Sequence, residues 1–490
     1  MKRKIAKVLE YIVSFIILNI ILHGTCFSLS ISFGTESIFN NGVTWPVSAA
    51  PLDENHVIIA YSDWEDGNTY GNGKAVIATI SGINITYGPE YQFNSYSQYV
   101  SVAALDANHA IIVYKDGYLE YGRARVATIT GDSISYGYKS PYTVNNGEVF
   151  FNTVTALDAT HALIGYAFVD DYEYKYGHVS FVTIIDTDIL YESDYMFNYD
   201  GTYDISITTL DVNKAFIAYR DPRGASFDYG TAVVASIYGT NVTCGSEYVF
   251  NATPTYYVSA SSLDNTHAIL AYQDGGNSSY GSAKIATISG SSISYGSEYV
   301  FNYRSTGEID IYSLSPNYAL IAYTDIENSD YCGNAIIAEI VDTDISFSNE
   351  YTFNTARPGV SSIAPVDDNT ALIAYQDYGN EDYGTGIVAE ISTFGINPEI
   401  ESEIRFSENK LINYPNPFSS STTIEYGISC KLKTEPIEIR IYNILGQLVK
   451  TIEATNGITE LDMSEMIPGI YLYEIRSTNY CNVQKMILIK

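Results

Sequence analysis

Positive charge is scarce in this sequence. Among its 490 residues, 25 Lys and Arg stand against 57 Asp and Glu, which gives a formal net charge of −32. Residues 29–395 carry most of the imbalance, with twelve basic and 44 acidic side chains. Because nucleic-acid phosphates are bound by Lys and Arg, this balance predicts that the region has no nucleic-acid partner. An acidic surface also favours solubility and repels anionic lipid.

Cysteine and catalytic motifs are rare as well. The chain has five Cys, and Cys244 and Cys332 occur at positions where other copies of an internal repeat have other residues. They therefore form no repeated disulfide framework. A bridge between Cys430 and Cys481 in an oxidising compartment is left open by the sequence. No nucleophile elbow, Walker loop, HExxH or CxxC pattern is present, so the sequence names no catalytic residue.

Long apolar runs are missing except at the N-terminus. There, Lys2, Arg3 and Lys4 precede the apolar run Tyr11–Leu22, which is short for a membrane span. The pattern predicts a signal peptide over residues 1–28, with cleavage after Ser28 or Ser30. No other segment has the length and hydropathy of a span, so the mature chain is expected to have no transmembrane segment.

An internal sequence repeat fills most of the chain. A recurring Tyr marks its seven copies, about 52 residues apart: Tyr61, Tyr114, Tyr166, Tyr219, Tyr272, Tyr323 and Tyr375. The best-preserved copy divides into four short runs, 257–263, 267–274, 283–289 and 293–301, dense in Val, Ile, Tyr and Ala. Turn-rich Gly, Asn, Asp and Ser separate them, and no part of the repeat has helical periodicity.

Four-stranded units of this length are typical of β-propeller blades. The seventh copy ends at Ser392 without its fourth run, and a matching segment, Ile31–Asn40, stands near the N-terminus. We therefore expect an all-β fold in which residues 31–395 form a seven-bladed β-propeller, closed by the N-terminal strand. This pairing would cover an otherwise open sheet edge.

The C-terminal part follows a different pattern. Alternating Ile437, Ile439 and Ile441 suggest a strand of a small sandwich. The segments LINYPNPF, IYNILGQ and PGIYLYEI carry the most specific residues, which are Tyr414, Pro415, Asn416, Pro417, Phe418, Gly446, Gly469, Tyr471 and the final Lys490. With these motifs, residues 411–490 resemble the type A C-terminal sorting domain (Por family) of the type IX secretion system of Bacteroidetes. An acidic linker, residues 396–410, separates them from the repeats.

The resemblance implies a small Ig-like β-sandwich after the propeller. It also implies export through the type IX secretion machinery, with the domain removed by a sortase-like peptidase. The protein would then be extracellular or on the outer-membrane surface. Whether it is released or stays attached is left open.

One carboxylate recurs in the repeats two residues after the marker Tyr. It is present in six of the seven copies, at Asp63, Asp116, Asp221, Asp274, Asp325 and Asp377. The loop after it varies in length, which is typical of an adaptable binding rim. These residues are therefore candidates for binding a sugar, or Ca²⁺ through oxygen ligands. The alternative is that each Asp caps a turn, because a residue needed once for catalysis has no reason to recur in six repeats. No other cofactor is expected.

Two further sets of residues are weaker leads. Four repeats share a His, at His56, His109, His161 and His267. Equivalent positions of different blades lie too far apart to share a zinc ion, so these are interpreted as turn residues and no metal site is predicted. The cluster Asp170, Asp171 and Glu173 in the third repeat is the one acidic group that breaks the pattern.

Regular blades favour a non-enzymatic binding protein at the cell surface or outside the cell, with a glycan, a polymer or a protein as its ligand. The first alternative is a secreted polysaccharide hydrolase or lyase that acts in the propeller's central depression. Such an enzyme needs blade-specific polar residues in one pocket. The second alternative is a purely structural surface protein. Whether the chain is an enzyme is left undecided.

Overall fold

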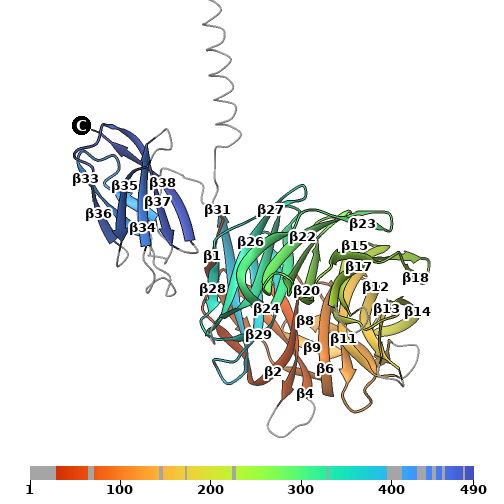
Figure 1. The fold of residues 1–490 in the computed structure, drawn as a ribbon. Coiled ribbons are helices and arrows are strands. Elements are labelled where there is room, and N and C mark those ends of the chain that lie inside the picture. Colours follow the sequence, from red (N-terminus) through yellow and green to blue (C-terminus); the bar gives the residue numbers. More distant parts are fainter. Residues whose placement is uncertain are drawn as a thin grey trace, which may run out of the picture. The chain divides into compact units, whose positions relative to one another are not determined.

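All named elements of the computed structural model are β-strands (Figure 1). The structure describes residues 29–64, 71–142, 147–170, 174–222, 228–327, 330–393, 411–426, 437–443, 448–454, 458–477 and 480–489. The predicted signal peptide and acidic linker lie outside these ranges. The all-β prediction is confirmed, and no helix of the described residues is long and apolar enough to cross a membrane. Contacts divide the chain into two compact units, Met1–Gly395 and Ile396–Lys490.

Each repeat of the first unit folds as an antiparallel run of strands. The first strands are β2 (Ser37–Pro51), β6 (Tyr91–Asp106), β11 (Val149–Asp158), β15 (Tyr203–Asp211), β20 (Thr255–Ser262), β24 (Tyr299–Ser315) and β29 (Pro358–Asp367). The second strands are β3 (His56–Trp64), β7 (His109–Asp116), β12 (His161–Val169), β16 (Lys214–Pro222), β21 (His267–Asp274), β25 (Tyr318–Glu327) and β30 (Thr370–Asp377). The third strands are β4 (Gly71–Ser81), β8 (Gly122–Thr130), β13 (Lys175–Ile185), β17 (Asp228–Tyr238), β22 (Tyr280–Ser289), β26 (Asp330–Val341) and β31 (Tyr383–Thr393). Repeats are numbered 1 to 7 in this order.

The fourth run of the repeat differs from the expected continuous strand. In repeat 5, β23 (Ser292–Tyr295) pairs with β22, and after a gap the start of β24 pairs with β22 again. The gap contains Gly296, whose N–H donates to the Ile285 oxygen at 2.9 Å and holds the interruption against the sheet. Other fourth-run pieces are β1 (Leu29–Phe33), β5 (Asn84–Tyr87), β9 (Ser133–Tyr136), β10 (Ser140–Pro141), β18 (Asn241–Cys244), β19 (Tyr248–Asn251), β27 (Asp344–Phe347) and β28 (Tyr351–Asn354). Repeat 3 instead has one strand, β14 (Asp188–Asn198).

First strands of successive repeats are linked by a repeated hydrogen bond. The Ser48 hydroxyl of repeat 1 accepts from the Val102 N–H of repeat 2 at 3.1 Å. The same acceptor role falls to Ser101, Ser206, Ser259 and Asp310. The Ser362 hydroxyl of repeat 7 then accepts from the Ala49 N–H of repeat 1 at 3.0 Å. Repeat 7 therefore lies beside repeat 1, as each earlier repeat lies beside the next.

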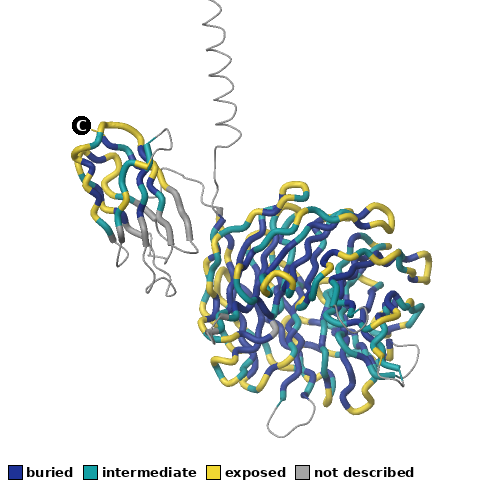
Figure 2. Tube along the Cα trace, viewed as in Figure 1, coloured by how far each residue is buried: buried dark blue, intermediate teal, exposed yellow. Residues whose placement is uncertain are grey.

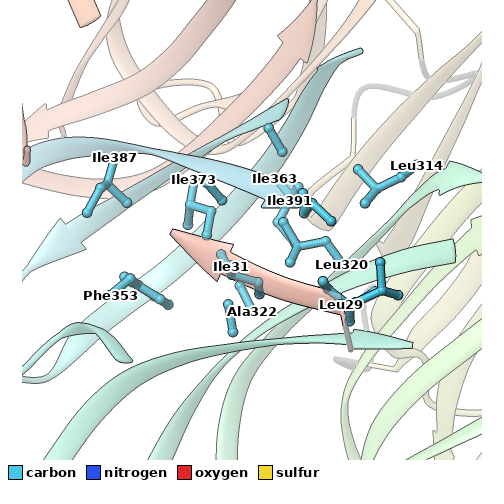
Figure 3. Close-up of a cluster of buried hydrophobic side chains, with 14 of the residues drawn as sticks. Leu29, Ile31, Leu314, Leu320, Ala322, Phe353, Ile363, Ile373, Ile387 and Ile391 are labelled. Carbon is cyan, nitrogen blue, oxygen red and sulfur yellow. The ribbon is translucent and has the colours of Figure 1, made fainter. Parts of the chain in front are cut away.

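Strand β1 supplies the run that repeat 7 lacks. It pairs antiparallel with β31, Ile31 opposite Ile391, and β2 continues the pairing from Ser37. Figure 3 shows Leu29 and Ile31 of β1 within a buried cluster that includes Leu320 of repeat 6, and the two side chains are only 8% and 5% exposed. The pairing predicted for Ile31–Asn40 is present.

Residues after β1 repeat the contacts made by the other fourth runs. Glu36 accepts from the Tyr375 hydroxyl at 2.7 Å, as Glu298 accepts from Tyr272 in repeat 5. A Cβ on Gly34 would lie 2.1 Å from the Ile83 oxygen of repeat 1, so only glycine fits this approach. The N-terminal segment thus plays the part of a fourth run in detail, by pairing, by hydrogen bond and by its contact with the next repeat.

Second and third strands form the core of each repeat (Figure 2). In β21, the run Ala268–Tyr272 is fully buried. The recurrent Tyr-Gly and Phe-Asn motifs meet here: a Cβ on Gly281 would lie 2.4 Å from the ring of Phe301. Glycine is required because the aromatic ring packs directly on the strand backbone.

The second unit contains two antiparallel sheets. One joins β32 (Leu411–Tyr414), β33 (Ser421–Tyr426) and β36 (Ile458–Asp462), and the other joins β34 (Ile437–Asn443), β35 (Leu448–Ala454), β37 (Gly469–Ser477) and β38 (Tyr480–Leu488). Both contribute to one buried cluster, for example Ile424 and Ile439. The PNP segment is built into this unit, since Asn416 bonds the backbone of Lys485 and Ile487 at 3.1 and 2.9 Å while Phe418 is 2% exposed.

Candidate functional site

The six recurrent Asp residues lie at the ends of second strands, beside the first strands of their own repeats. All six are buried, with exposed fractions of 1% for Asp63, Asp221 and Asp325, 3% for Asp116, and 5% for Asp274 and Asp377. Each belongs to a separate repeat, so the fold does not gather them into one site.

Their carboxylates are engaged by groups of their own repeat and, for Asp274, of the preceding repeat as well. Asp274 accepts from the Asn251 amide at 3.1 Å and from the Gly276 N–H at 3.0 Å. Asp63 pairs with Lys74 at 2.6 Å, and Asp325 pairs with Arg304 at 2.8 Å. The bonds to Gly276 N–H, and the equivalent bond of Asp377, are those of a turn cap. Binding of an external ligand by the six residues stays a prediction.

The repeated His residues are the first residues of the second strands β3, β7, β12 and β21. Nδ1 of His56 is 2.9 Å from Asp53, and His109, His161 and His267 make the same contact with Asp106, Asp158 and Asp264. Within the part of the chain that the structure describes, no three His, Cys, Asp or Glu side chains form a cluster able to hold a metal ion. Of the acidic cluster in repeat 3, Asp170 accepts from the Tyr174 N–H at 3.0 Å, whereas Asp171 and Glu173 lie outside the described residues.

A feature that the sequence does not reveal is a β-bulge near the start of every first strand. In repeat 5, Tyr256 lies opposite Gln273 but Ser259 lies opposite Ala271, so two residues, Tyr257 and Val258, face one partner. The same shift occurs in all seven repeats. The first bulge residue has a positive φ in five of them: Tyr99, Phe151, Asp204, Tyr257 and Glu308. A bulge redirects its side chains out of the regular alternation.

The bulges of four repeats enclose a small cavity. Its volume is about 210 Å³, and it is lined by the bulge pairs 151–152, 204–205, 257–258 and 308–309 together with Ser361. We call it the bulge cavity. It brings together side chains of repeats 3 to 7 that are far apart in the sequence and that differ from repeat to repeat.

Asn152 breaks the apolar pattern of the second bulge residue. Counted from the residue that bonds the next repeat (Ser48, Ser101 and their equivalents), five of the other repeats have Val47, Val100, Ile205, Val258 and Ile309 at this position, and repeat 7 has Ser361. Asn152 is 8% exposed, and neither its Oδ1 nor its Nδ2 has a hydrogen-bond partner among the described protein atoms. Because an unpaired buried amide is unfavourable, its presence on a cavity wall points to a ligand.

Two carboxylates share the cavity with Asn152. Asp204 accepts from the Tyr257 N–H at 3.1 Å and lies 3.5 Å from Nε of Arg220. Burial raises the pKa of Asp204, and the Arg220 charge opposes that shift. Burial likewise raises the pKa of Glu308; the nearby Arg357 charge lowers this pKa, whereas the Asp204 charge raises it further. The two carboxyl groups therefore influence each other across one site.

Aromatic rings and cations continue along the same edge of the first strands. Ring centroids of Tyr99 and Phe151 are 5.6 Å apart, and those of Phe151 and Tyr203 are 5.5 Å apart. Nζ of Lys175 lies 4.8 Å from the Tyr203 centroid, and Cζ of Arg220 lies 4.5 Å from it. These contacts are of cation–π type and hold the cations beside the rings.

The sequence did not predict this site, because the candidate residues were those that recur at equivalent positions of the repeats. The lining positions are those where the repeats differ: Trp45, Tyr99, Phe151, Asp204, Tyr257, Glu308 and Gly359 occupy the first bulge position. The variation was a usable signal, since polar residues specific to one blade are what a single pocket requires.

Residues 413–490 match the family model described as a secretion system C-terminal sorting domain. The resemblance of the C-terminal region is thereby confirmed. A domain of this kind directs export to the extracellular space or the outer-membrane surface and interacts with the type IX secretion machinery. The family match covers the second unit and leaves the repeats unassigned.

No curated protein matches the chain. Among solved structures, a protein of unknown function from Dyadobacter fermentans is similar with a TM-score of 0.45 and 10% identity, over 74% of this chain and 99% of the other. A Hadza microbial sialidase is similar with a TM-score of 0.44 and 9% identity, over 73% and 66%. AofleA from Arthrobotrys oligospora gives 0.41 and 6%, over 67% and 91%. At these TM-scores the likeness says nothing of function.

Proposed function

We propose that the chain is an exported seven-bladed β-propeller that binds a ligand in the bulge cavity without transforming it. The propeller is supported by seven four-stranded repeats, by the hydrogen bonds that link successive first strands, and by the pairing of β1 with β31. The hydrogen bond from Ala49 to Ser362 joins the first strands of repeats 1 and 7. The pairing of β1 with β31 joins the N-terminal segment to the third strand of repeat 7, and a closed ring requires both connections.

The observation that carries the binding function is the unpartnered amide of Asn152 on the cavity wall. Five of the other six repeats have an apolar residue there and repeat 7 has Ser361, so the fold itself has no need of an amide. A ligand that accepts from Nδ2 and donates to Oδ1 would satisfy a group that otherwise loses its hydration. Asp204 and Glu308 offer further acceptors in the same space.

Hydrolysis of a polysaccharide is the second candidate function. It is favoured by the presence of two carboxylates, Asp204 and Glu308, from different repeats on one cavity, because glycoside hydrolases use a pair of carboxyl groups. Burial raises both pKa values, however, whereas acid and base roles need environments that separate the two values. Binding without turnover therefore agrees better with the site. A purely structural role leaves Asn152 unexplained.

Export completes the proposal. The second unit, with its two sheets around one core, is proposed to be an Ig-like sandwich that a sortase-like peptidase removes. The predicted signal peptide would take the chain to the periplasm first. The six recurrent Asp residues, and Ca²⁺ bound to them, remain a candidate for additional binding at the same rim.

A glycan array probed with the full exported chain tests the proposal. The array is run with Ca²⁺ and with EDTA, using the wild type, Asn152→Val, and the control Asn241→Val at the exposed first residue of β18. Glycan binding that is lost in Asn152→Val but kept in Asn241→Val supports binding in the cavity. Loss of glycan binding in EDTA would favour the Asp residues as the binding groups. Release of shortened glycan from a bound probe would favour the hydrolase. Binding that is unchanged in Asn152→Val would overturn the cavity as the site.

A further inference from the structure

Each carboxylate of the bulge cavity has a guanidinium group near it. Asp204 lies 3.5 Å from the Arg220 guanidinium, and Glu308 is influenced by the charge of Arg357. A site with two carboxylates and no counter-charge would demand a cation, and a site dominated by guanidinium groups would demand an anion. Because each carboxylate has a guanidinium group near it, a neutral ligand meets the least electrostatic opposition.

The polar groups of the cavity suit hydroxyls. A hydroxyl is both donor and acceptor, so it pairs with either atom of an amide and also donates to a carboxylate. Asn152 offers Oδ1 and Nδ2 without internal partners, and Asp204 uses Oδ2 for the Tyr257 N–H. A ligand with adjacent hydroxyls could therefore bond the amide and a carboxylate together.

Apart from Ser361, the rest of the wall is apolar. Ile205, Val258 and Ile309 line the cavity, together with the rings of Phe151 and Tyr257. A volume of about 210 Å³ is below the range of about 300 Å³ and more for pockets that take drug-sized ligands. The cavity has room for one small ring with an apolar face, and the remainder of a larger ligand would stay outside.

We propose that the bulge cavity binds one neutral pyranose residue of a glycan, with its hydroxyls on Asn152, Asp204 and Glu308 and its C–H face toward Tyr257. This inference rests on the proposed function and specifies its ligand class. Uronic acids would face Asp204 and Glu308, which line the cavity, unfavourably.

Saturation-transfer NMR and calorimetry on the full exported chain test this ligand class. The probes are the methyl pyranosides of glucose, galactose, mannose and fucose, with glucuronate and glucosamine as charged counterparts. We expect at least one neutral probe to bind. Asn152→Val should weaken it about tenfold or more, because several hydrogen bonds are lost, and Asn241→Val should leave it unchanged. Asp204→Asn, which keeps the shape and removes the charge, should weaken it less than Asn152→Val does.

The outcomes separate the inference from the function on which it rests. Binding of only the charged probes, weakened by Asn152→Val, would overturn the neutral pyranose and keep the cavity as the binding site. Failure of all neutral probes would also overturn the neutral pyranose. Binding of a neutral probe that neither Asn152→Val nor Asp204→Asn affects would overturn both the ligand class and the site.

Discussion

Replacing Asn152 by Val should stabilise the protein. The amide is 8% exposed and lacks a hydrogen-bond partner among the described protein atoms, and Val100 and Val258 occupy the same position in other repeats. An unsatisfied buried polar group costs about 1–3 kcal/mol. Val is also favoured over Asn in strands, which acts in the same direction. The free energy of unfolding should therefore rise by about 1–3 kcal/mol.

The melting temperature should change by a small but measurable amount. Strands of the first unit span roughly 365 residues, from Leu29 to Thr393. With an unfolding entropy of about 2.1 cal/mol/K per residue, the gain corresponds to a rise of about 1–4 °C. Differential scanning calorimetry of the ligand-free wild type, Asn152→Val and Asn241→Val measures it, and the exposed control should stay within about 0.5 kcal/mol of the wild type.

A fall of the melting temperature in Asn152→Val would refute the reasoning, because the amide would then be stabilising the fold through a partner of its own. A rise together with lost ligand binding is the expected pair of results. It would identify Asn152 as a residue kept for function at the expense of stability.

The remaining predictions concern closure, pH and export. Ile31→Ala should lower the free energy of unfolding by about 2–5 kcal/mol, because Ile31 is buried between repeats, and an unchanged thermal melt would contradict the role given to β1. Burial raises the pKa of Asp310 to about 6, above the unfolded value of 3.8, so its contribution to stability is present below about pH 4 and lost as the pH rises through 6. Asp310→Ser, which introduces the residue found at the equivalent position of repeat 5, should flatten that fall in urea melts between pH 4 and 7.5; an equally steep fall would exclude Asp310 as its source. Deleting residues 411–490 should leave the protein in the periplasm, as fractionation would reveal, whereas normal surface delivery would contradict the sorting assignment.

Much of the fold was predictable because each repeat must solve the same packing problem. Gly281 must face the Phe301 ring, so Tyr-Gly and Phe-Asn recur together in the sequence. Tyr272 must bond Glu298, so these residues recur with a fixed spacing. The missing run of repeat 7 was visible for the same reason, since Ile31–Asn40 carries the residues of a fourth run. A packing constraint that recurs in every repeat therefore produces a recurrent residue pattern in the sequence.

The bulge cavity could not be predicted in this way. A register shift follows from the geometry of paired strands, and no residue type marks it here: Tyr257, Phe151 and Glu308 all take a positive φ, which large side chains rarely adopt. Without the shift, strict alternation would place these residues on a sheet face. The interruption of the fourth run was not predicted either. The sequence indicates one continuous strand over 293–301, whereas the pairing with β22 is interrupted at Gly296.

Repetition also limits what recurrent residues can do for a single ligand. Asp274 and its equivalents lie in different repeats. Asp274 is held by the Gly276 N–H of its own turn and by Asn251 of the preceding repeat, so it serves its own turn. The first strands, in contrast, run side by side around the unit, and their bulges are the places where neighbouring repeats meet. A site for one ligand must therefore be built from positions that vary between repeats. Asn152, Asp204 and Glu308 meet that requirement: all three line one cavity, and each occupies a bulge position whose residue varies between repeats.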